Sequence, residues 1–217
     1  MTYRLRIPNG PFRTFILLAL LGLPFGPVSH GNAGSAEMQN PAASLLERSR
    51  EAALPVAKEL MQTLEGRLQS AMTAGGPPEA IRVCQEQAGV LTGKVRENKE
   101  ITYLKRVGVR IRNPENAPDA AEKRALAHFL ENGAQEGQFP MEWVDRIALP
   151  DGSEQVRYYR AIPMQARCLL CHGPEESMPE SVLHALKKRY PEDAARGFGA
   201  GELRGLLVVG LDPDKLE

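Results

Sequence analysis

The chain has 217 residues, long enough for one well-buried domain plus a targeting segment. Its 42% hydrophobic and 25% charged residues are ordinary for a soluble globular protein. Because 27 Lys and Arg residues balance 27 Asp and Glu residues, the net charge predicts neither a nucleic-acid partner nor a strongly charged docking surface.

Residues 1–36 have the pattern of a secretory signal peptide. Three arginines precede the apolar run FILLALLGL, and the small residues GNAGSA follow it. The run is shorter than the roughly 20 apolar residues of an ordinary membrane-spanning helix, although a retained anchor is an alternative. We expect the mature protein to be a single domain, residues 37–217, with no stable membrane span, located in the periplasm.

A long helical segment is predicted next, in two parts. Apolar residues at helical spacing predict a helix over 41–75, which Pro55 should kink or divide. The sequence GGPP at 75–78 is a clear break. A second helix over about 78–97 places Cys84 on the same face as Ile81, so we expect the Cys84 side chain to point into the core.

The rest of the chain alternates predicted strands and helices. In order, we expect a strand at 101–113, a helix at about 119–132, a β-hairpin over 141–162 around the turn PDGS, a short helix near 179–189 and a final buried strand, ELRGLLVVGLD. Several strands with helices before and between them predict one α+β domain and not a helical bundle.

The stretch QARCLLCHGPEES, residues 165–177, contains the pattern C-x-x-C-H in CLLCH. This pattern is the attachment signature of c-type haem. Cys168 and Cys171 are spaced to bond the two vinyl groups of one porphyrin, and His172 then reaches the iron from the same side. Covalent haem attachment takes place outside the cytoplasmic membrane, in agreement with the predicted export.

Three other interpretations of the two thiols are weighed against haem. A structural zinc site needs four Cys or His ligands, usually in two close pairs, and the second pair is missing. A redox dithiol belongs between a strand and a helix, whereas Pro174 and Pro179 disfavour a long helix here. A plain disulfide between such close cysteines has no evident stabilising purpose. One covalently attached haem c is therefore the favoured cofactor.

The sixth ligand of such an iron has several candidates. Met178 follows the motif too closely to reach the other side of the ring, so the search moves upstream. Cys84, His128 and Met164 are considered there, along with Met61 and Met72 on the first helix, which are more typical of core packing. A lone cysteine in an exported protein is exposed to oxidation unless it is buried or bound to a metal, which makes Cys84 a candidate thiolate ligand.

Several segments together resemble the family of exported monohaem c-type proteins that have a PAS-like domain, found alone or as the sensor part of membrane signalling proteins. The segments are AIRVCQEQA (80–88), VRIRNPENAPD (109–119), YYRAIPMQARCLLCHG (158–173), RYPEDAARGFGAGELRG (189–205) and the final strand. The resemblance implies a PAS-like antiparallel sheet flanked by helices. It also implies a six-coordinate haem with His172 and, opposite it, Cys84 as the metal ligands. The stretch LKRVGVRIRNP departs from the more polar sequence expected before RNP.

The function expected from these features is a redox or gas sensor domain, not an enzyme. A thiolate ligand stabilises ferric iron and lowers the reduction potential, which suits redox sensing or the binding of NO or CO. The alternatives are a periplasmic electron-transfer cytochrome c with its partner protein and, less consistent with the hairpin, a helical cytochrome c prime. Four arginines are candidates for the haem propionates, with solvation as their default role: Arg110, Arg112, Arg160 and Arg167.

Overall fold

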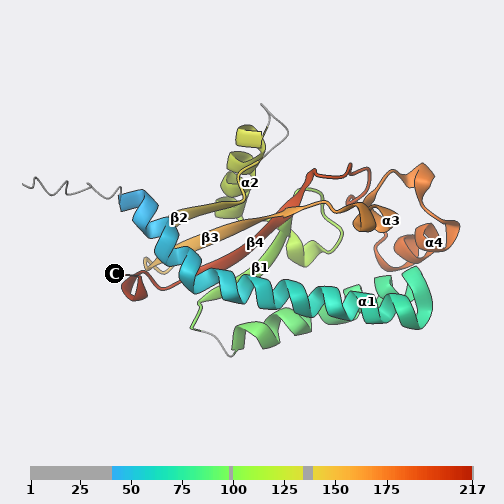
Figure 1. The fold of residues 1–217 in the computed structure, drawn as a ribbon, viewed down its shortest axis with the longest axis horizontal. Helices are drawn as coiled ribbons and strands as arrows, with labels where there is room; N and C mark the ends of the chain where they lie inside the picture. Colours follow the sequence, from blue (N-terminus) through green and yellow to red (C-terminus); the bar gives the residue numbers. More distant parts are fainter. Residues whose placement is uncertain (1–40, 98–99, 134–138, 217) are drawn as a thin grey trace, which may run out of the picture. The chain divides into compact units, whose positions relative to one another are not determined.

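A four-stranded antiparallel sheet forms the centre of the fold in the computed structural model (Figure 1). The structure describes residues 41–97, 100–133 and 139–216, which belong to one unit, Gln39–Glu217. The signal peptide predicted for residues 1–36 lies outside this described part. Within it, no helix has the length and apolar character needed to cross a membrane.

The strands lie in the order β1-β4-β3-β2, so the last strand of the chain is inserted between the first strand and the hairpin. Their bounds are Tyr103–Gly108 for β1, Glu142–Ala148 for β2, Glu154–Pro163 for β3 and Leu203–Leu211 for β4. The predicted hairpin and final strand are confirmed. The predicted strand at 101–113 is shorter, because the chain after Gly108 turns toward the short 3-10 helix η1, Pro114–Asn116.

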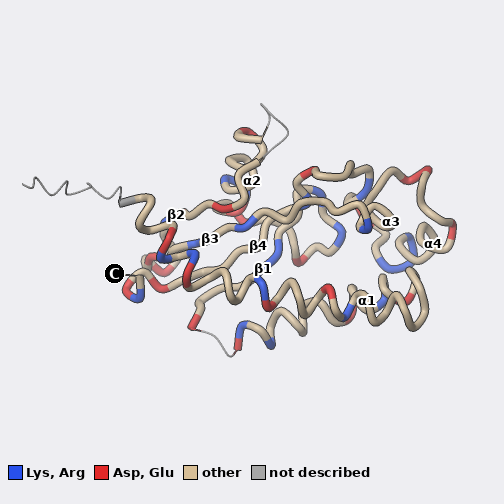
Figure 2. Tube along the Cα trace, in the orientation of Figure 1, with Lys and Arg blue, Asp and Glu red and all other residues tan. Residues whose placement is uncertain are grey.

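Helices cover both faces of the sheet. The long helix α1, Pro41–Glu97, packs its Ala57 and Leu60 against Val209 and neighbouring residues of one face. The helix α2, Ala120–Gly133, packs its Phe129 against Val208 and the other face. The fold is therefore mixed α+β with an antiparallel sheet between helices, as predicted. Basic and acidic residues alternate along the chain and do not gather into large single-sign blocks (Figure 2).

The helix α1 is a hairpin of two arms joined at Gly75 and Gly76, the two positions in it with non-helical backbone angles. Gly76 has φ +67° and ψ −162°, a conformation open essentially to glycine alone. The second arm returns beside the first (Figure 1). The predicted break at GGPP is thus confirmed, and it brings the segment that carries Cys84 back over the sheet.

Pro55 does not divide the first arm, contrary to the sequence prediction. Its side chain is exposed, and the backbone around it keeps helical angles. A proline removes one helical hydrogen bond, but its neighbours Ala53, Val56 and Ala57 are buried against the sheet. This packing holds the helix together across the missing bond.

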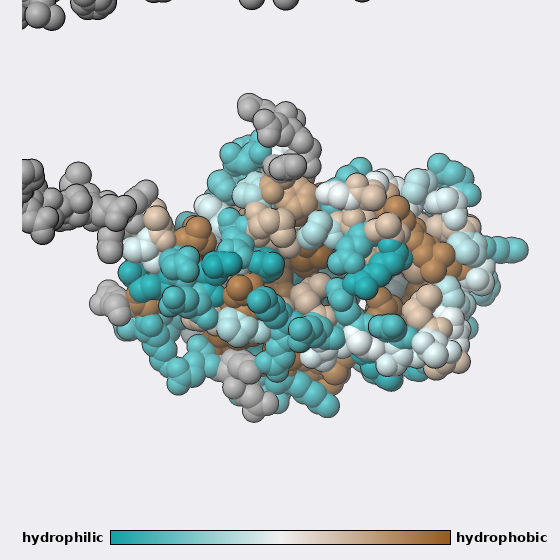
Figure 3. Space-filling model, in the orientation of Figure 1, coloured by the Kyte–Doolittle hydropathy of each residue, from teal (hydrophilic) through white to brown (hydrophobic). Residues whose placement is uncertain are grey.

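Two further helices stand at the other end of the sheet. The short α3, Leu169–His172, follows the 3-10 helix η2, Ala166–Cys168. The helix α4, Glu180–Arg189, packs on the second arm of α1. On the face shown in Figure 3, hydrophobic surface appears between hydrophilic side chains toward this end of the unit.

The sheet face that α1 covers changes character from one end to the other. Cross-strand pairing forms one row from Leu104, Val209 and Tyr158, all of which belong to the apolar core under α1. In the next row, Leu207 lies between Arg106 and Arg160. The row after that pairs Gly108 with Gly205, whose added β-carbon would lie 2.0 Å from the Val107 carbonyl oxygen. Toward α3 this face therefore replaces large core side chains first with two arginines and then with two glycines.

Candidate haem site

The motif CLLCH forms a short helical turn at the end of the sheet. The residues of η2 run directly into α3, and the Gly173 amide donates a 2.8 Å hydrogen bond to the Leu169 carbonyl, which ends the turn. Cys168, Cys171 and His172 are half-buried, and all three cysteines of the chain are free thiols. The two thiols and the imidazole are thus presented together from one turn, as the haem motif requires.

The ring of His172 is fixed by the backbone. Its Nδ1 lies 2.8 Å from the Ala195 carbonyl oxygen, which makes Nδ1 the protonated nitrogen and leaves Nε2 free to bind a metal. Burial, with help from the charges of Arg112 and Arg204, lowers the pKa of His172 to about 3. The imidazole is therefore uncharged at neutral pH, the form that ligates iron.

A loop from Asp193 to Phe198 holds the motif in place. The Phe198 amide donates a 2.9 Å hydrogen bond to the His172 carbonyl, and the Gly197 amide donates a 2.7 Å bond to the Gly173 carbonyl. The Phe198 ring also meets the imidazole edge to face, with ring centroids 6.3 Å apart. The segment RYPEDAARGFGAGELRG, which contains this loop, thus contacts both the backbone and the imidazole of the motif.

Arg112 connects the motif, the loop and the turn before α2. Its guanidinium donates to the carbonyls of Cys171 and Ala195, and its Nε lies 3.0 Å from Asp193 Oδ1. Asp193 is fully buried and also accepts from the Ala195 amide at 2.9 Å. Burial raises the pKa of Asp193, but the hydrogen bonds from Arg112, the Ala195 amide and Arg196, with the charge of Arg112, together outweigh burial and lower the pKa. Asp193 carries no functional signal of its own in the sequence, although it lies within the segment RYPEDAARGFGAGELRG that carries part of the resemblance.

Cys84 is exposed, which corrects the expectation that it points into the core. The buried positions around it are Ile81 and Val83, because the second arm of α1 packs on the first arm and on α4 through them. Desolvation by nearby protein raises the pKa of the Cys84 thiol even so, and the charges of Arg106 and Arg112 oppose the rise. The thiol therefore does not serve as core packing.

The arm that carries Cys84 meets the haem motif through one apolar cluster. Ile81, one turn before Cys84, packs with Leu186 and Tyr190, and Cys171 packs against the same cluster. Burial raises the pKa of Cys171, and the charges of Cys84 and Cys168 add to the rise. The thiols of Cys84 and Cys168 thus each lie within electrostatic range of the Cys171 thiol.

The other candidate ligands lie elsewhere or are used in packing. His128 on α2 stacks on Trp143, with ring centroids 4.5 Å apart, on the sheet face opposite to α1. Met164 is buried with Phe198 behind the motif. Met61 lies in the apolar core between α1 and the sheet. Met72 packs between the arms of α1, and Met178 packs with α4.

The four arginines considered for the haem propionates each have a carboxylate partner. These pairs are Arg110 with Glu202, Arg112 with Asp193, Arg160 with Glu142 and Arg167 with Glu65. Two other arginines near the motif, Arg106 and Arg204, have no carboxylate partner among the described residues. The sequence carried no signal that singled them out.

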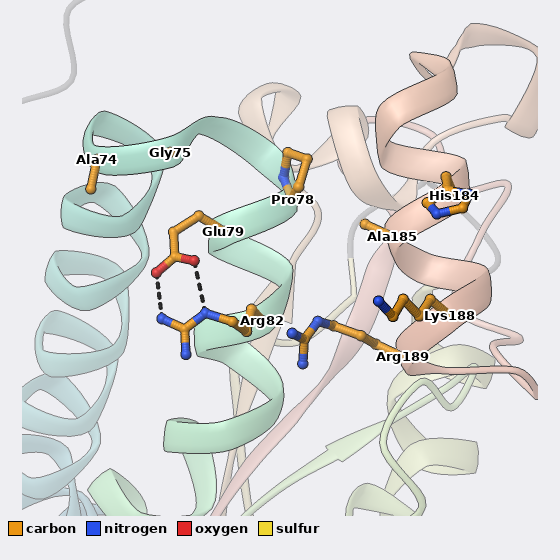
Figure 4. A pocket seen from close by; sticks show the side chains of 9 residues that line it. All are labelled: Ala74, Gly75, Pro78, Glu79, Arg82, His184, Ala185, Lys188 and Arg189. Carbon is orange, nitrogen blue, oxygen red and sulfur yellow. Dashed lines mark hydrogen bonds and ion pairs between the residues drawn. The ribbon is translucent and has the colours of Figure 1, made fainter.

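A separate hollow of about 560 Å³ lies between the bend of α1 and α4 (Figure 4). Its charged side chains include Lys188 and Arg189 from α4 and, from α1, Arg82 bonded to Glu79. None of the three cysteines lines it. It is therefore distinct from the region of the haem motif.

The donors at the motif fit haem c. Two free thiols at the required spacing stand beside an uncharged imidazole whose second nitrogen is held by a carbonyl. One further soft donor, Cys84, lies within electrostatic range of Cys171. Among the described residues, no group of three or more Cys, His, Asp and Glu side chains is arranged to hold a metal ion by itself.

Comparison with known proteins gives one family and one solved structure. The model of the Tll0287-like family matches residues 35–211. The crystal structure of the cyanobacterial heme-protein Tll0287 is similar, with 25% sequence identity, a TM-score of 0.51, and coverage of 73% of this chain and 93% of that chain. No curated protein matches. Since the family model spans most of the sequence, the chain belongs to the Tll0287-like family, a family of haem-binding proteins.

Proposed function

We propose that this protein is an exported, periplasmic c-type monohaem protein that acts as a redox or gas sensor domain and not as an enzyme. In this proposal Cys168 and Cys171 would attach one haem, and His172 and Cys84 would bind its iron. The single observation that carries it is the bond from His172 Nδ1 to the Ala195 carbonyl, made beside two free thiols. The likeness to a haem protein supports it.

The protein's own residues have distinct tasks in this proposal. The carbonyl of Ala195 orients the imidazole and makes it a stronger donor. The Cys84 thiol, once deprotonated, supplies an anionic ligand, and the charges of Arg106 and Arg112 favour that thiolate. A haem held by these residues would supply one-electron chemistry and an iron able to bind NO or CO.

The sensor role rests on the location of Cys84. It is exposed on the second arm of α1, one turn after the point where that arm contacts α4 through Ile81. Release of Cys84 on reduction, or its displacement by a gas, would remove one link between this arm and the motif. The second arm would then have two states, with Cys84 bound and with Cys84 released, and a partner protein would distinguish them.

A haemochrome spectrum tests the cofactor itself. We expect the purified, full-length protein to give a c-type spectrum, with haem that stays with the protein under denaturing conditions. The Cys168→Ala, Cys171→Ala double variant should retain no covalent haem. Haem that denaturation extracts from the parent protein would refute covalent attachment.

Redox titration in the presence and absence of CO separates the sensor from the periplasmic electron carrier. A sensor should lose a ligand on reduction and bind CO, with a change in the visible spectrum. A carrier keeps both ligands, ignores CO and exchanges electrons quickly with a partner protein. A ferrous protein that does not bind CO would therefore favour the carrier.

A further inference from the structure

Arg106 and Arg204 are half-buried cations without acidic partners. The Arg106 side chain makes no ion pair or hydrogen bond with any described residue, and the Arg204 side chain donates only to the Arg110 carbonyl, at 3.0 Å. Every other buried or half-buried arginine in the described ranges has a carboxylate partner: Arg82, Arg110, Arg112, Arg157, Arg160, Arg189 and Arg196. Burying a charge is costly unless it is paired. These two positions are the exceptions.

The Arg204 guanidinium reaches β1 two residues after Arg106, because a β-carbon added at Gly108 would lie 2.8 Å from Arg204 Nη1. Arg106 shares a row with Leu207 on the sheet face that α1 covers, and it is close enough to Cys84 for their charges to interact. Arg204 is the second residue of β4, and its guanidinium lies 5.3 Å from the centre of the Phe198 ring, which contacts His172. One arginine therefore approaches the thiol ligand and the other approaches the imidazole.

Their charges also repel one another. The cations Arg112, Arg106 and Arg110, after burial, lower the pKa of Arg204 to about 10. Burial lowers the pKa of Arg106 as well. Since Asp193 and Glu202 already pair with Arg112 and Arg110, the surplus positive charge belongs to Arg106 and Arg204.

We propose that Arg106 and Arg204 bind the two propionate carboxylates of the haem. A guanidinium pairs with a carboxylate through two parallel hydrogen bonds, and two propionates supply the two negative charges that this region lacks. Gly108 and Gly205, which pair across β1 and β4, stand next to the two arginines in the same strands and add no side chain there. This inference rests on the proposed function, because it requires haem at the motif.

Resonance Raman spectroscopy of the haem-loaded protein tests the contact, because the propionate bending bands respond to hydrogen bonds on the carboxylates. We expect these bands to shift in Arg106→Gln and in Arg204→Gln. Arg160→Gln is the matched control: Arg160 flanks Leu207 in the same row as Arg106 but already pairs with Glu142. Its bands should match those of the parent.

The reduction potential gives a second readout. Loss of a nearby positive charge favours ferric haem, so each Gln variant should shift the one-electron equilibrium about tenfold toward the ferric form, or about 59 mV. If a Gln variant does not load haem, Arg106→Lys and Arg204→Lys keep the charge and alter only the hydrogen bonds. Their propionate bands should shift while their potentials stay near that of the parent.

The outcomes separate this inference from the function on which it rests. Unchanged propionate bands in the haem-loaded Arg106 and Arg204 variants would overturn the inference. A lower reduction potential would not rescue it, because a nearby charge can change the potential without touching the propionates. A parent protein without covalent haem would instead overturn the proposed function.

Discussion

Asp193 joins three groups that hold the haem motif. Its carboxylate accepts from Arg112, from the Ala195 amide and from Arg196 Nε, while the Ala195 carbonyl holds His172. Because Asp193 is fully buried and Arg112 is 11% exposed, the pair is shielded from water. The position of the imidazole therefore depends on a charge pair that the sequence pattern does not reveal.

We predict that Asp193→Asn lowers the free energy of unfolding by about 3 kcal/mol, since it leaves the Arg112 charge buried and unpaired. The measurement is urea unfolding of the haem-loaded protein. Glu154→Gln is the control, because Glu154 forms an exposed 3.9 Å pair with Arg146 and should matter by less than about 0.5 kcal/mol. Equal effects of the two substitutions would contradict this account of the buried pair.

The pKa of Asp119 lies below its ordinary value of 3.8. Burial acts to raise this pKa, but the hydrogen bond from the Glu122 amide and the Arg157 guanidinium together outweigh the effect of burial. Asp119 caps α2, because its carboxylate accepts from the Glu122 amide at 2.8 Å and the Glu122 carboxylate accepts from the Asp119 amide at 2.8 Å. A carboxyl group whose pKa is lower in the folded than in the unfolded protein stabilises the fold at pH values above its unfolded-state pKa. This stability is lost as the pH falls through the folded-state pKa.

We therefore predict that Asp119→Asn, which keeps the capping oxygen but not the charge, is less stable than the parent at pH 7. The gap between the two unfolding free energies should shrink as the pH falls below about 4. Chemical denaturation at a series of pH values from 7 to 3 measures it. A gap of constant size over that range would rule out the charge as its cause.

At the scale of elements, the hairpin of α1 is what brings Cys84 to the site. The first arm packs along the sheet, the Gly75–Gly76 bend reverses the chain, and the second arm lies against α4. Sequence analysis located this break from GGPP because glycine and proline interrupt a helix for local reasons. It misjudged Pro55, because the packing of neighbouring residues on the sheet is not a local property.

Substitution by alanine should have opposite effects on stability at two glycines of α1, one at the bend and one within the first arm. Gly76→Ala should destabilise the protein by about 1–3 kcal/mol, since φ +67° with ψ −162° strains any residue with a β-carbon. Gly66→Ala, where an added β-carbon meets nothing within 4 Å, should instead stabilise it by about 0.5–1 kcal/mol. Urea unfolding of both variants measures this. A stabilised Gly76→Ala variant would show that the backbone at the bend is not strained for alanine.

For the whole molecule, the sequence predicted the element types, the break in the first helix and the haem motif, because periodicity, glycine–proline pairs and C-x-x-C-H are local patterns. It did not predict that Cys84 is exposed, since both faces of its helix carry apolar residues and only the packing of α1 on itself and on α4 selects one. The unpaired Arg106 and Arg204 depend on strand register. They were therefore beyond the reach of local patterns.

The central claim is that Cys84 and His172, from segments far apart in the chain, bind one haem iron. The most direct test is the visible and electron paramagnetic resonance spectrum of haem-loaded Cys84→Ala beside the parent, in both redox states. We predict that loss of the thiolate changes the ferric spectra and raises the reduction potential, because an anionic donor stabilises ferric iron. Spectra identical to those of the parent in both redox states would contradict ligation by Cys84.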